Sequence, residues 1–111
     1  MTDPHTVLLH VSSRPEDVAR SIGTARTLHR SRPDHRIRII VNGPAITGVT
    51  ADATPLDLSH LPATAVIEAC EVGMRAHDIV AEQLQPGVTT VASAVVALVD
   101  AQFAGAACVR I

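Results

Sequence analysis

Aromatic residues are almost missing from this chain of 111 residues, which has one phenylalanine and neither tryptophan nor tyrosine. Proteins that bind single-stranded nucleic acid usually stack the bases on aromatic side chains. The scarcity of such side chains excludes that mode of recognition. The apolar 47% of the sequence consists mainly of Ala, Val, Leu and Ile, and it is enough for one domain with one core, spanning residues 1–111.

A surplus of charge of one sign is also lacking, since the formal net charge is −2. All nine basic residues are arginines, and seven of them fall between Arg14 and Arg38. We interpret these arginines as a solvated helix face, with an anion-binding patch as the alternative. A duplex-binding surface needs more positive charge, so we expect no nucleic-acid partner.

Cysteine is limited to Cys70 and Cys108, which form neither a disulfide framework nor a zinc-ligand spacing. The six histidines contain no pair four residues apart, so their spacing predicts no metal site. No dinucleotide, phosphate-loop or nucleophile-elbow motif is present either, and we expect no cofactor.

Long apolar runs are absent too. No stretch reaches the ~20 apolar residues that a membrane span needs, and the first residues lack the pattern of a signal peptide. We therefore expect a cytoplasmic protein without a membrane partner.

What the chain does have is a set of five short apolar runs that alternate with segments of helical spacing. The runs predict strands at residues 5–11, 36–41, 65–67, 88–91 and 106–111. The first run does not alternate strictly with polar residues, which is typical of a strand covered on both faces of a parallel sheet. The expected fold class is α/β, with three layers and a mainly parallel five-stranded sheet.

Two of the intervening segments have clear helix signals. Ser13 and Glu16 fit a capping box for a helix that runs to about residue 30. Ser93 is the predicted N-cap of a helix that runs through Phe103 and stops at Gly105. The side chains expected to face inward are Val18, Ile22, Ala25, Leu28 and His29 in the first helix and Val95, Val96, Val99 and Phe103 in the second.

The other connections have weaker patterns. Residues 45–62 predict a loop with one short helix near 56–61. A helix is expected after Cys70, with the side chains of Val72, Ala76 and Ile79 on its inner face.

Cys70 stands where the third predicted strand passes into that helix. A thiol at this place would meet the partial positive charge of a helix N-terminus, which favours the thiolate. Glu71 would offset part of that charge. The structural alternative is that Cys70 is a small buried hydrophobic residue. Cys108, inside the last run, is predicted to lie in the core.

The carboxyl ends of parallel strands meet at one edge of a sheet, which is where open α/β sheets bind ligands. The residues predicted to meet there with Cys70 are His10, Ser12, Ser13, Asn42, Gly43 and Ser93. Structural interpretations stay open: Ser13 and Ser93 as helix caps, Asn42 and Gly43 as a turn, and His10 as a hydrogen-bonded core histidine. His77, seven residues after Cys70, is either a neighbour of the thiol or a surface histidine.

In their order and spacing, these segments resemble the DsrE/DsrF-like sulfur-relay family, in particular its small YchN-like branch. The segments that carry the resemblance are VLLHV at 7–11, IIVNGPAI at 39–46, IEACEVGMRAHDI at 67–79, LQPGVTTVASAVVALVDAQFAG at 84–105 and the closing strand. The resemblance implies an α/β/α domain that assembles into a homotrimer or a homohexamer. It also implies that Cys70 carries sulfur as a persulfide. The mean hydropathy of +0.27 independently favours a homo-oligomer, because one small core will not hide that much apolar surface.

The resulting hypothesis is a sulfur carrier whose Cys70 thiolate takes a sulfane sulfur from a donor protein and passes it to an acceptor thiol. Ser12, Asn42 and the helix amides would stabilise the anion. One alternative is a non-enzymatic oligomeric module that binds a small anion or a protein, with Cys70 as packing. Another is a subunit that supports a heteromeric relay complex. Whether the chain is an enzyme stays open at this point.

Overall fold

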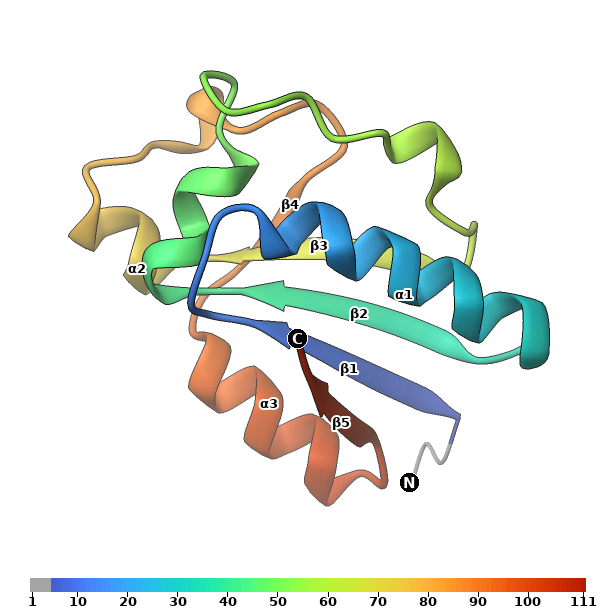
Figure 1. The fold of residues 1–111 in the computed structure, drawn as a ribbon. Coiled ribbons are helices and arrows are strands. Elements are labelled where there is room, and N and C mark those ends of the chain that lie inside the picture. The colour runs from blue at the N-terminus through green and yellow to red at the C-terminus, as the bar shows by residue number, and fades with distance from the viewer. Residues whose placement is uncertain (1–4) are drawn as a thin grey trace.

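The computed structural model describes residues 5–111, which form one five-stranded sheet with the strand order β4-β3-β2-β1-β5 (Figure 1). All four strand pairings are parallel, so the predicted fold class is confirmed. The strands are β1 (Thr6–Val11), β2 (Arg36–Val41), β3 (Ala65–Cys70), β4 (Thr89–Val91) and β5 (Ala107–Arg110). The helices are α1 (Asp17–Ser31), α2 (Glu71–Ala76) and α3 (Ala94–Phe103), with short 3-10 helices η1 (Gly43–Val49), η2 (Leu58–His60) and η3 (Ala81–Gln83).

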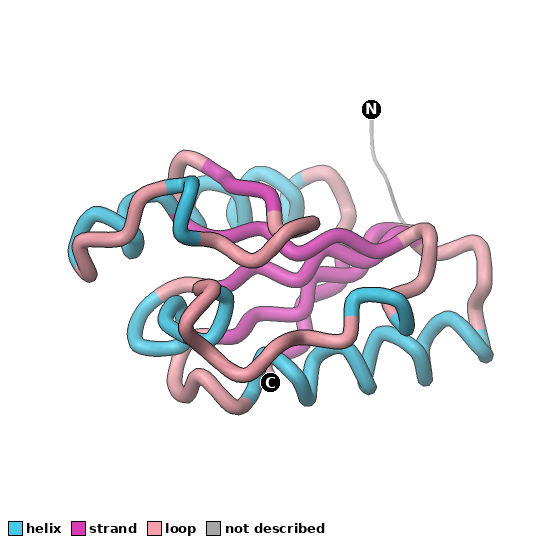
Figure 2. The backbone as a smooth tube through the Cα atoms, turned by 90° about the horizontal axis from the view of Figure 1, so that it is seen from above, coloured by secondary structure: helices cyan, strands magenta, loops and turns pink. Residues whose placement is uncertain are grey.

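Helices cover both faces of the sheet, which gives three layers (Figure 2). The face that we call the α1 face carries buried apolar side chains along β1, β2 and β3: Val7, Leu9, Val11, Ile37, Ile39, Val41, Ala65, Ile67 and Ala69. The opposite face, which we call the α3 face, is mixed. Leu8 and Ile40 are fully buried on it, whereas Arg38 and Glu68 form an ion pair that reaches solvent. No helix among residues 5–111 combines the length and the apolarity needed to cross a bilayer.

The start of α1 differs from the predicted capping box. The helix begins at Asp17, and Ser13 lies exposed outside it. A backbone turn replaces the side-chain cap, because the amide of Asp17 donates to the carbonyl oxygen of Arg14 at 3.1 Å. The predicted inner face of the helix is confirmed: Val18, Ile22 and Ala25 are buried, and Leu28 and His29 are half-buried.

The predicted loop over 45–62 is wrong in its first half. The 3-10 helix η1 occupies it, and Ala45, Ile46 and Val49 are fully buried against α1 and β3. Their spacing among Gly and Thr has no regular period, so only the tertiary contacts reveal that they belong to the core. The short helix expected near 56–61 is present as η2.

Helix α3 has the predicted ends but not the predicted orientation. The Ser93 hydroxyl accepts a hydrogen bond from the Val96 amide at 3.4 Å, and Gly105 takes a positive φ of 104°. The expected inner face is wrong, since Phe103 is 86% exposed. Ala94 and Leu98 are the buried residues of the helix instead, while Val95, Val96 and Val99 are also exposed. Because nearly every position of α3 is apolar, spacing alone cannot select the side that packs.

Two further expectations fail beside the sheet. Helix α2 buries Met74, whereas Val72 is 50% exposed and Ala76 is exposed. Cys108 is exposed rather than in the core, because β5 is an edge strand whose four residues are all exposed in the single chain.

Candidate functional site

The carboxyl edge of the sheet brings three of the predicted site residues into one row. In the strand register, Val11 is opposite Val41, and Val41 is opposite Ala69. The next residue of each segment is therefore Ser12, Asn42 or Cys70, and these neighbours point to the α3 face. Parallel pairing thus produces the convergence that the sequence predicted.

Gly43 allows the ends of two of these segments to approach closely, and Gly73 lies beside them in ordinary van der Waals contact. Gly43 has a positive φ of 56°, and a Cβ at this position would lie 2.7 Å from the carbonyl oxygen of Ser12. A Cβ on Gly73 would lie 3.6 Å from the amide nitrogen of Gly43 and 3.9 Å from the Cβ of Cys70. A side chain at position 43 would be strained both by the backbone conformation and by the clash. Gly43 is therefore a turn residue and also the point where the ends of β1 and β2 meet.

The Cys70 sulfur lies at the N-terminus of α3. Its Sγ accepts a hydrogen bond from the Ala94 amide at 3.3 Å, and the residue is 4% exposed. The sequence had associated this thiol with the helix that follows it, but Cys70 makes no side-chain cap bond to α2. The amide of a ten-residue helix pointing at sulfur is a favourable partner for negative charge there. The expected environment is present, supplied by a different helix.

The Glu71 carboxylate is hydrogen-bonded to the neighbouring strand β4. Its Oε2 accepts a hydrogen bond from the Thr90 hydroxyl at 2.7 Å, which holds the carboxylate beside β4. Glu71 and Thr90 both line a shallow hollow of about 240 Å³ next to α2, together with Met74 and Arg75. The Thr90 hydroxyl therefore stabilises part of the negative charge of Glu71.

His10 is paired to Asn42 across the β1–β2 edge. The His10 Nε2 and the Asn42 Oδ1 are 2.9 Å apart, and both side chains are half-buried. On the other side of β1, the Arg110 guanidinium donates to the Ser12 hydroxyl at 3.4 Å. His10 is thus a hydrogen-bonded histidine, as the structural alternative expected. The Arg110 contact is the site feature that the sequence missed, since only the β1–β5 pairing brings it there.

Ser93 has a structural role, and His77 is a surface histidine. The Ser93 hydroxyl is used as the cap of α3, and Ser13 takes part in no cap. Helix α2 ends at Ala76, so a spacing of seven residues does not place His77 on the helix face of Cys70. His77 lines another hollow, with Thr47 and Asp52.

The exposure of the two cysteines is the reverse of the prediction. Cys70 is buried and Cys108 is exposed. Both side chains point to the α3 face. Cys108 is opposite Leu8, which lies on that face. Cys70 follows Glu68 by two residues on β3, and its sulfur contacts α3. In the single chain, Cys108 is the thiol that a solvent reagent meets first, whereas Cys70 has the organised surroundings.

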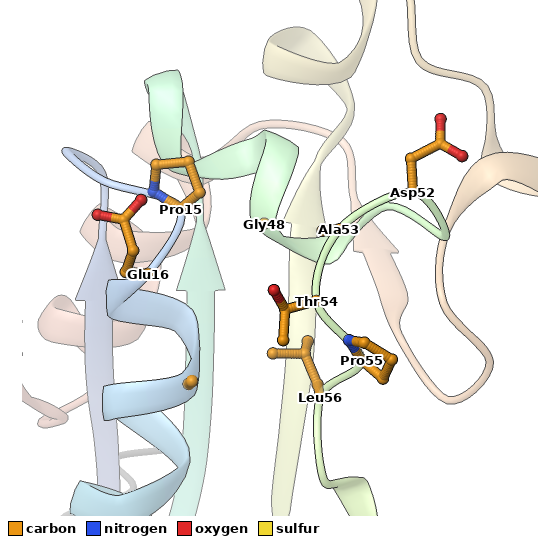
Figure 3. A pocket seen from close by; sticks show the side chains of 9 residues that line it. Pro15, Glu16, Gly48, Asp52, Ala53, Thr54, Pro55 and Leu56 are labelled. Carbon is orange, nitrogen blue, oxygen red and sulfur yellow. The ribbon is translucent and has the colours of Figure 1, made fainter.

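A hollow of about 370 Å³ lies elsewhere, between the start of α1 and residues 52–56 (Figure 3). Its ionisable residues are Glu16 and Asp52, which lie on opposite sides of it (Figure 3). None of the residues that converge at the carboxyl edge lines this hollow. This hollow is therefore separate from the candidate site at the carboxyl edge.

These features define a class: a small parallel α/β/α domain with a cysteine at the carboxyl edge of its sheet. No protein-family model and no curated protein matches the chain. Among solved structures, the chain is similar to MTH1491 from Methanobacterium thermoautotrophicum, a protein of unknown function, with a TM-score of 0.80 and 22% identity over 96% of this chain and 99% of that one. It is also similar to the ychN protein from E. coli, with a TM-score of 0.75 and 16% identity over the whole of both chains. At these identities the likeness establishes the fold.

Proposed function

We propose that the chain is a cytoplasmic sulfur carrier of the DsrE/DsrF-like type that holds a persulfide on Cys70. The observation that carries the proposal is the hydrogen bond from the Ala94 amide to the Cys70 sulfur at the N-terminus of α3. Negative charge on sulfur is the property that both the attacking thiolate and the persulfide product share. The similarity in fold to MTH1491 and to the ychN protein is compatible with this assignment.

The transfer needs no cofactor, because atoms and electrons balance between two sulfur species. The Cys70 thiolate attacks the terminal sulfur of a donor persulfide, and a new S–S bond forms on Cys70 as the S–S bond of the donor breaks. The donor leaves as a thiol after taking the proton of its former persulfide group. An acceptor thiolate then attacks the same sulfur, and Cys70 leaves as a thiolate.

The burial of Cys70 sets a condition on this chemistry. At 4% exposure, the sulfur is reached only when the segments that cover it open, and the first turn of α3 is the element in contact with it. We therefore expect transfer to depend on opening at this turn, which begins at the Ser93 cap with a long hydrogen bond of 3.4 Å.

A homo-oligomer, a trimer or a hexamer, belongs to the same proposal. Exposed apolar side chains gather on α3 and β5, where Phe103 is 86% exposed and Val109 is 45% exposed. The edge strand β5 also has one side without a neighbouring strand among the described residues. Exposed apolar side chains in this number on a small chain are typical of an interface.

The experiment that tests the carrier function compares two single-cysteine variants. Wild type, Cys70→Ser and Cys108→Ser are treated in the folded state with a persulfide donor, and intact mass measures the sulfur atoms gained. We expect wild type and Cys108→Ser to gain one sulfur that a thiol acceptor removes. Uptake by Cys70→Ser that equals wild type would show Cys108 to be the reactive thiol and would refute the proposal.

The second candidate is a non-enzymatic oligomeric module for a small anion or a protein partner, with Cys70 as packing. The burial of Cys70 favours this candidate, because a buried cysteine with an apolar core around it serves as a small hydrophobic residue. In the same experiment, it predicts that Cys70 takes up sulfur only after the protein is unfolded.

A further inference from the structure

The amino edge of the sheet holds a second cluster of reactive side chains, at the opposite end of the strands from Cys70. His5 directly precedes β1, and Asp34 and His35 directly precede β2. Because Thr6 is opposite Arg36 in the register, His5 and His35 face each other across the two strands. The Arg36 amide donates to the His5 carbonyl oxygen at 2.9 Å, which fixes the two backbones side by side.

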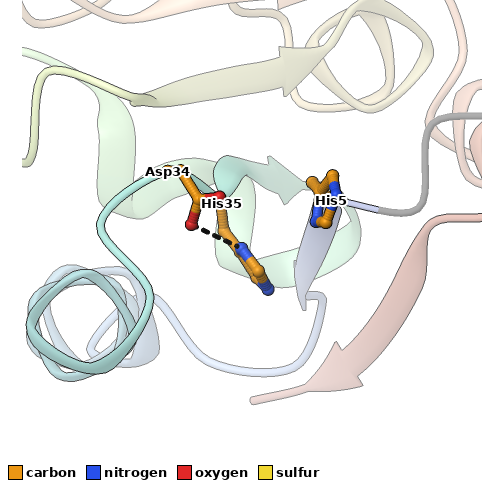
Figure 4. A group of neighbouring side chains, drawn as sticks. All are labelled: His5, Asp34 and His35. Atoms are coloured by element: carbon orange, nitrogen blue, oxygen red, sulfur yellow. Dashed lines mark ion pairs between the residues drawn. The ribbon is translucent and has the colours of Figure 1, made fainter.

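The three side chains converge (Figure 4). The ring centroids of His5 and His35 are 5.3 Å apart, with their planes inclined at 49°. The His35 Nδ1 is 3.4 Å from the Asp34 Oδ1. One ligand-type atom from each residue can be chosen so that all three lie within 4.8 Å of one another.

These distances suit a small divalent ion. Zinc binds imidazole nitrogen and carboxylate oxygen at about 2.0–2.2 Å, so tetrahedral ligand atoms lie roughly 3.4 Å apart. The Asp34–His35 pair already has that separation. His5 and Asp34 are exposed, so a small rotation of each side chain brings the third ligand atom within range.

Asp34 and His35 offer a carboxylate oxygen and an imidazole nitrogen to a metal ion. The Asp34 side chain is 77% exposed, so its carboxylate oxygens are within reach of an ion from solvent. The His35 Nδ1 is buried, and its polar neighbour is the Asp34 Oδ1 at 3.4 Å, which is an acceptor and would share the metal with it. Among residues 5–111, no hydrogen-bond donor occupies that nitrogen.

We propose that His5, Asp34 and His35 bind a divalent first-row transition-metal ion, zinc in the first instance, at the amino edge of the sheet. Two imidazoles and one carboxylate select such ions over calcium and magnesium, which take oxygen ligands. Three protein ligands leave the fourth position to water. The ion would join the start of β1 to the turn between α1 and β2, so zinc should raise the melting temperature. This site is independent of the proposed sulfur chemistry at Cys70.

The test uses metal-free protein without an affinity tag, titrated with Co²⁺ and then with competing Zn²⁺. We expect one Co²⁺ per chain, with the d–d absorption of a four-coordinate nitrogen and oxygen site and no thiolate charge-transfer band. His35→Ala and Asp34→Asn should each weaken binding at least tenfold and abolish the zinc-dependent rise in melting temperature. The far-UV spectrum of each variant is measured to verify that it is folded. If His35→Ala does not fold, Asp34→Asn still tests the site, because Asp34 is exposed.

The matched control is His60→Ala. His60 forms another histidine–aspartate pair, with its Nδ1 2.6 Å from the Asp57 Oδ2, but it belongs to no three-residue cluster among residues 5–111. We expect His60→Ala to bind Co²⁺ as wild type does. Equal binding by wild type and His35→Ala, or a thiolate band that disappears in Cys108→Ser, would overturn the proposal.

Discussion

The two faces of the sheet are built on different principles. The α1 face is apolar along β1, β2 and β3, and α1 and η1 cover it there, with Ile39 and Ile67 at 0% exposure. The α3 face has a helix of ten residues over part of it, and the rest carries the Arg38–Glu68 ion pair beside exposed Val66. Both cysteines lie on this second face.

This difference indicates that one face of the sheet mainly stabilises the fold and the other is open to binding. Burial of apolar side chains on the α1 face supplies most of the favourable free energy of folding. The α3 face keeps polar groups, an exposed helix and an edge strand, which are the features that binding and association use. Changes on the two faces should therefore have different consequences.

The largest effect on folding is expected from Ile39→Ala on the α1 face. The side chain is fully buried at the centre of β2, so its removal loses apolar burial and leaves a cavity. We expect the free energy of unfolding to fall by about 2–5 kcal/mol, measured by urea denaturation. The matched control on the other face is Val96→Ala on the exposed side of α3, which should change it by no more than about 0.5 kcal/mol. Similar losses for both variants would contradict the comparison.

A smaller loss is expected from Glu68→Ala on the α3 face. Glu68 accepts two hydrogen bonds from the Arg38 guanidinium, at 2.6 and 3.0 Å, and its side chain is 14% exposed. Its removal leaves Arg38 unpaired but 30% exposed, so solvent compensates part of the cost. We expect a decrease of about 1–3 kcal/mol in the free energy of unfolding. Double replacement by Arg38→Met and Glu68→Leu should recover much of it, whereas an additive loss would indicate that the pair itself matters little.

A modest, pH-dependent effect is expected at the start of α1. The Arg14 guanidinium, which donates to the Asp17 carboxylate at 3.1 Å, and the nearby Arg20 hold the pKa of Asp17 below its usual value of 3.8. A lowered folded-state pKa stabilises the folded chain at pH values above the unfolded pKa, and this contribution is lost as the pH falls through the folded pKa. Asp17→Asn should therefore be less stable than wild type at neutral pH, with the difference vanishing in strong acid. A difference that is constant with pH would exclude this ionic origin.

The smallest change in the stability of the single chain is expected from Phe103→Asp. The same variant should have the largest effect on the oligomeric state. The side chain is 86% exposed and makes little contribution to the core of the single chain. Light scattering should show an oligomer for wild type and a monomer for the variant, with unchanged far-UV spectra. A wild-type monomer at micromolar concentration would refute the proposed assembly.

The sequence predicted the sheet well because strand signals are local. Five apolar runs between polar turns indicated five strands, and the absence of strict alternation in β1 indicated burial on both faces. The convergence of Ser12, Asn42 and Cys70 followed from parallel pairing alone. Ser93 and Gly105 were likewise recognisable as helix ends, because capping depends on the nearest few residues.

Apart from the Ser13 cap, which a local backbone turn replaces, the failures arise where a contact from a distant segment decides the outcome. The side on which α3 packs is set by the sheet beneath it, and a helix that is apolar all round has no periodicity to reveal that side. The cluster of His5, Asp34 and His35 was invisible for the same kind of reason, since histidine spacing along the chain says nothing about two residues that strand register places opposite each other.

By itself, the sequence determined the alternation of strands and helices, the parallel sheet and the edge at which Cys70 lies, because these depend on local composition and on short connections. The tertiary structure decided which helix amide meets the sulfur, which cysteine is exposed, and which face of α3 remains open. Strand order is the physical reason. It makes β5 an edge strand that exposes Cys108. It also pairs β4 with β3, so that α3, which starts shortly after β4, has its N-terminus against Cys70.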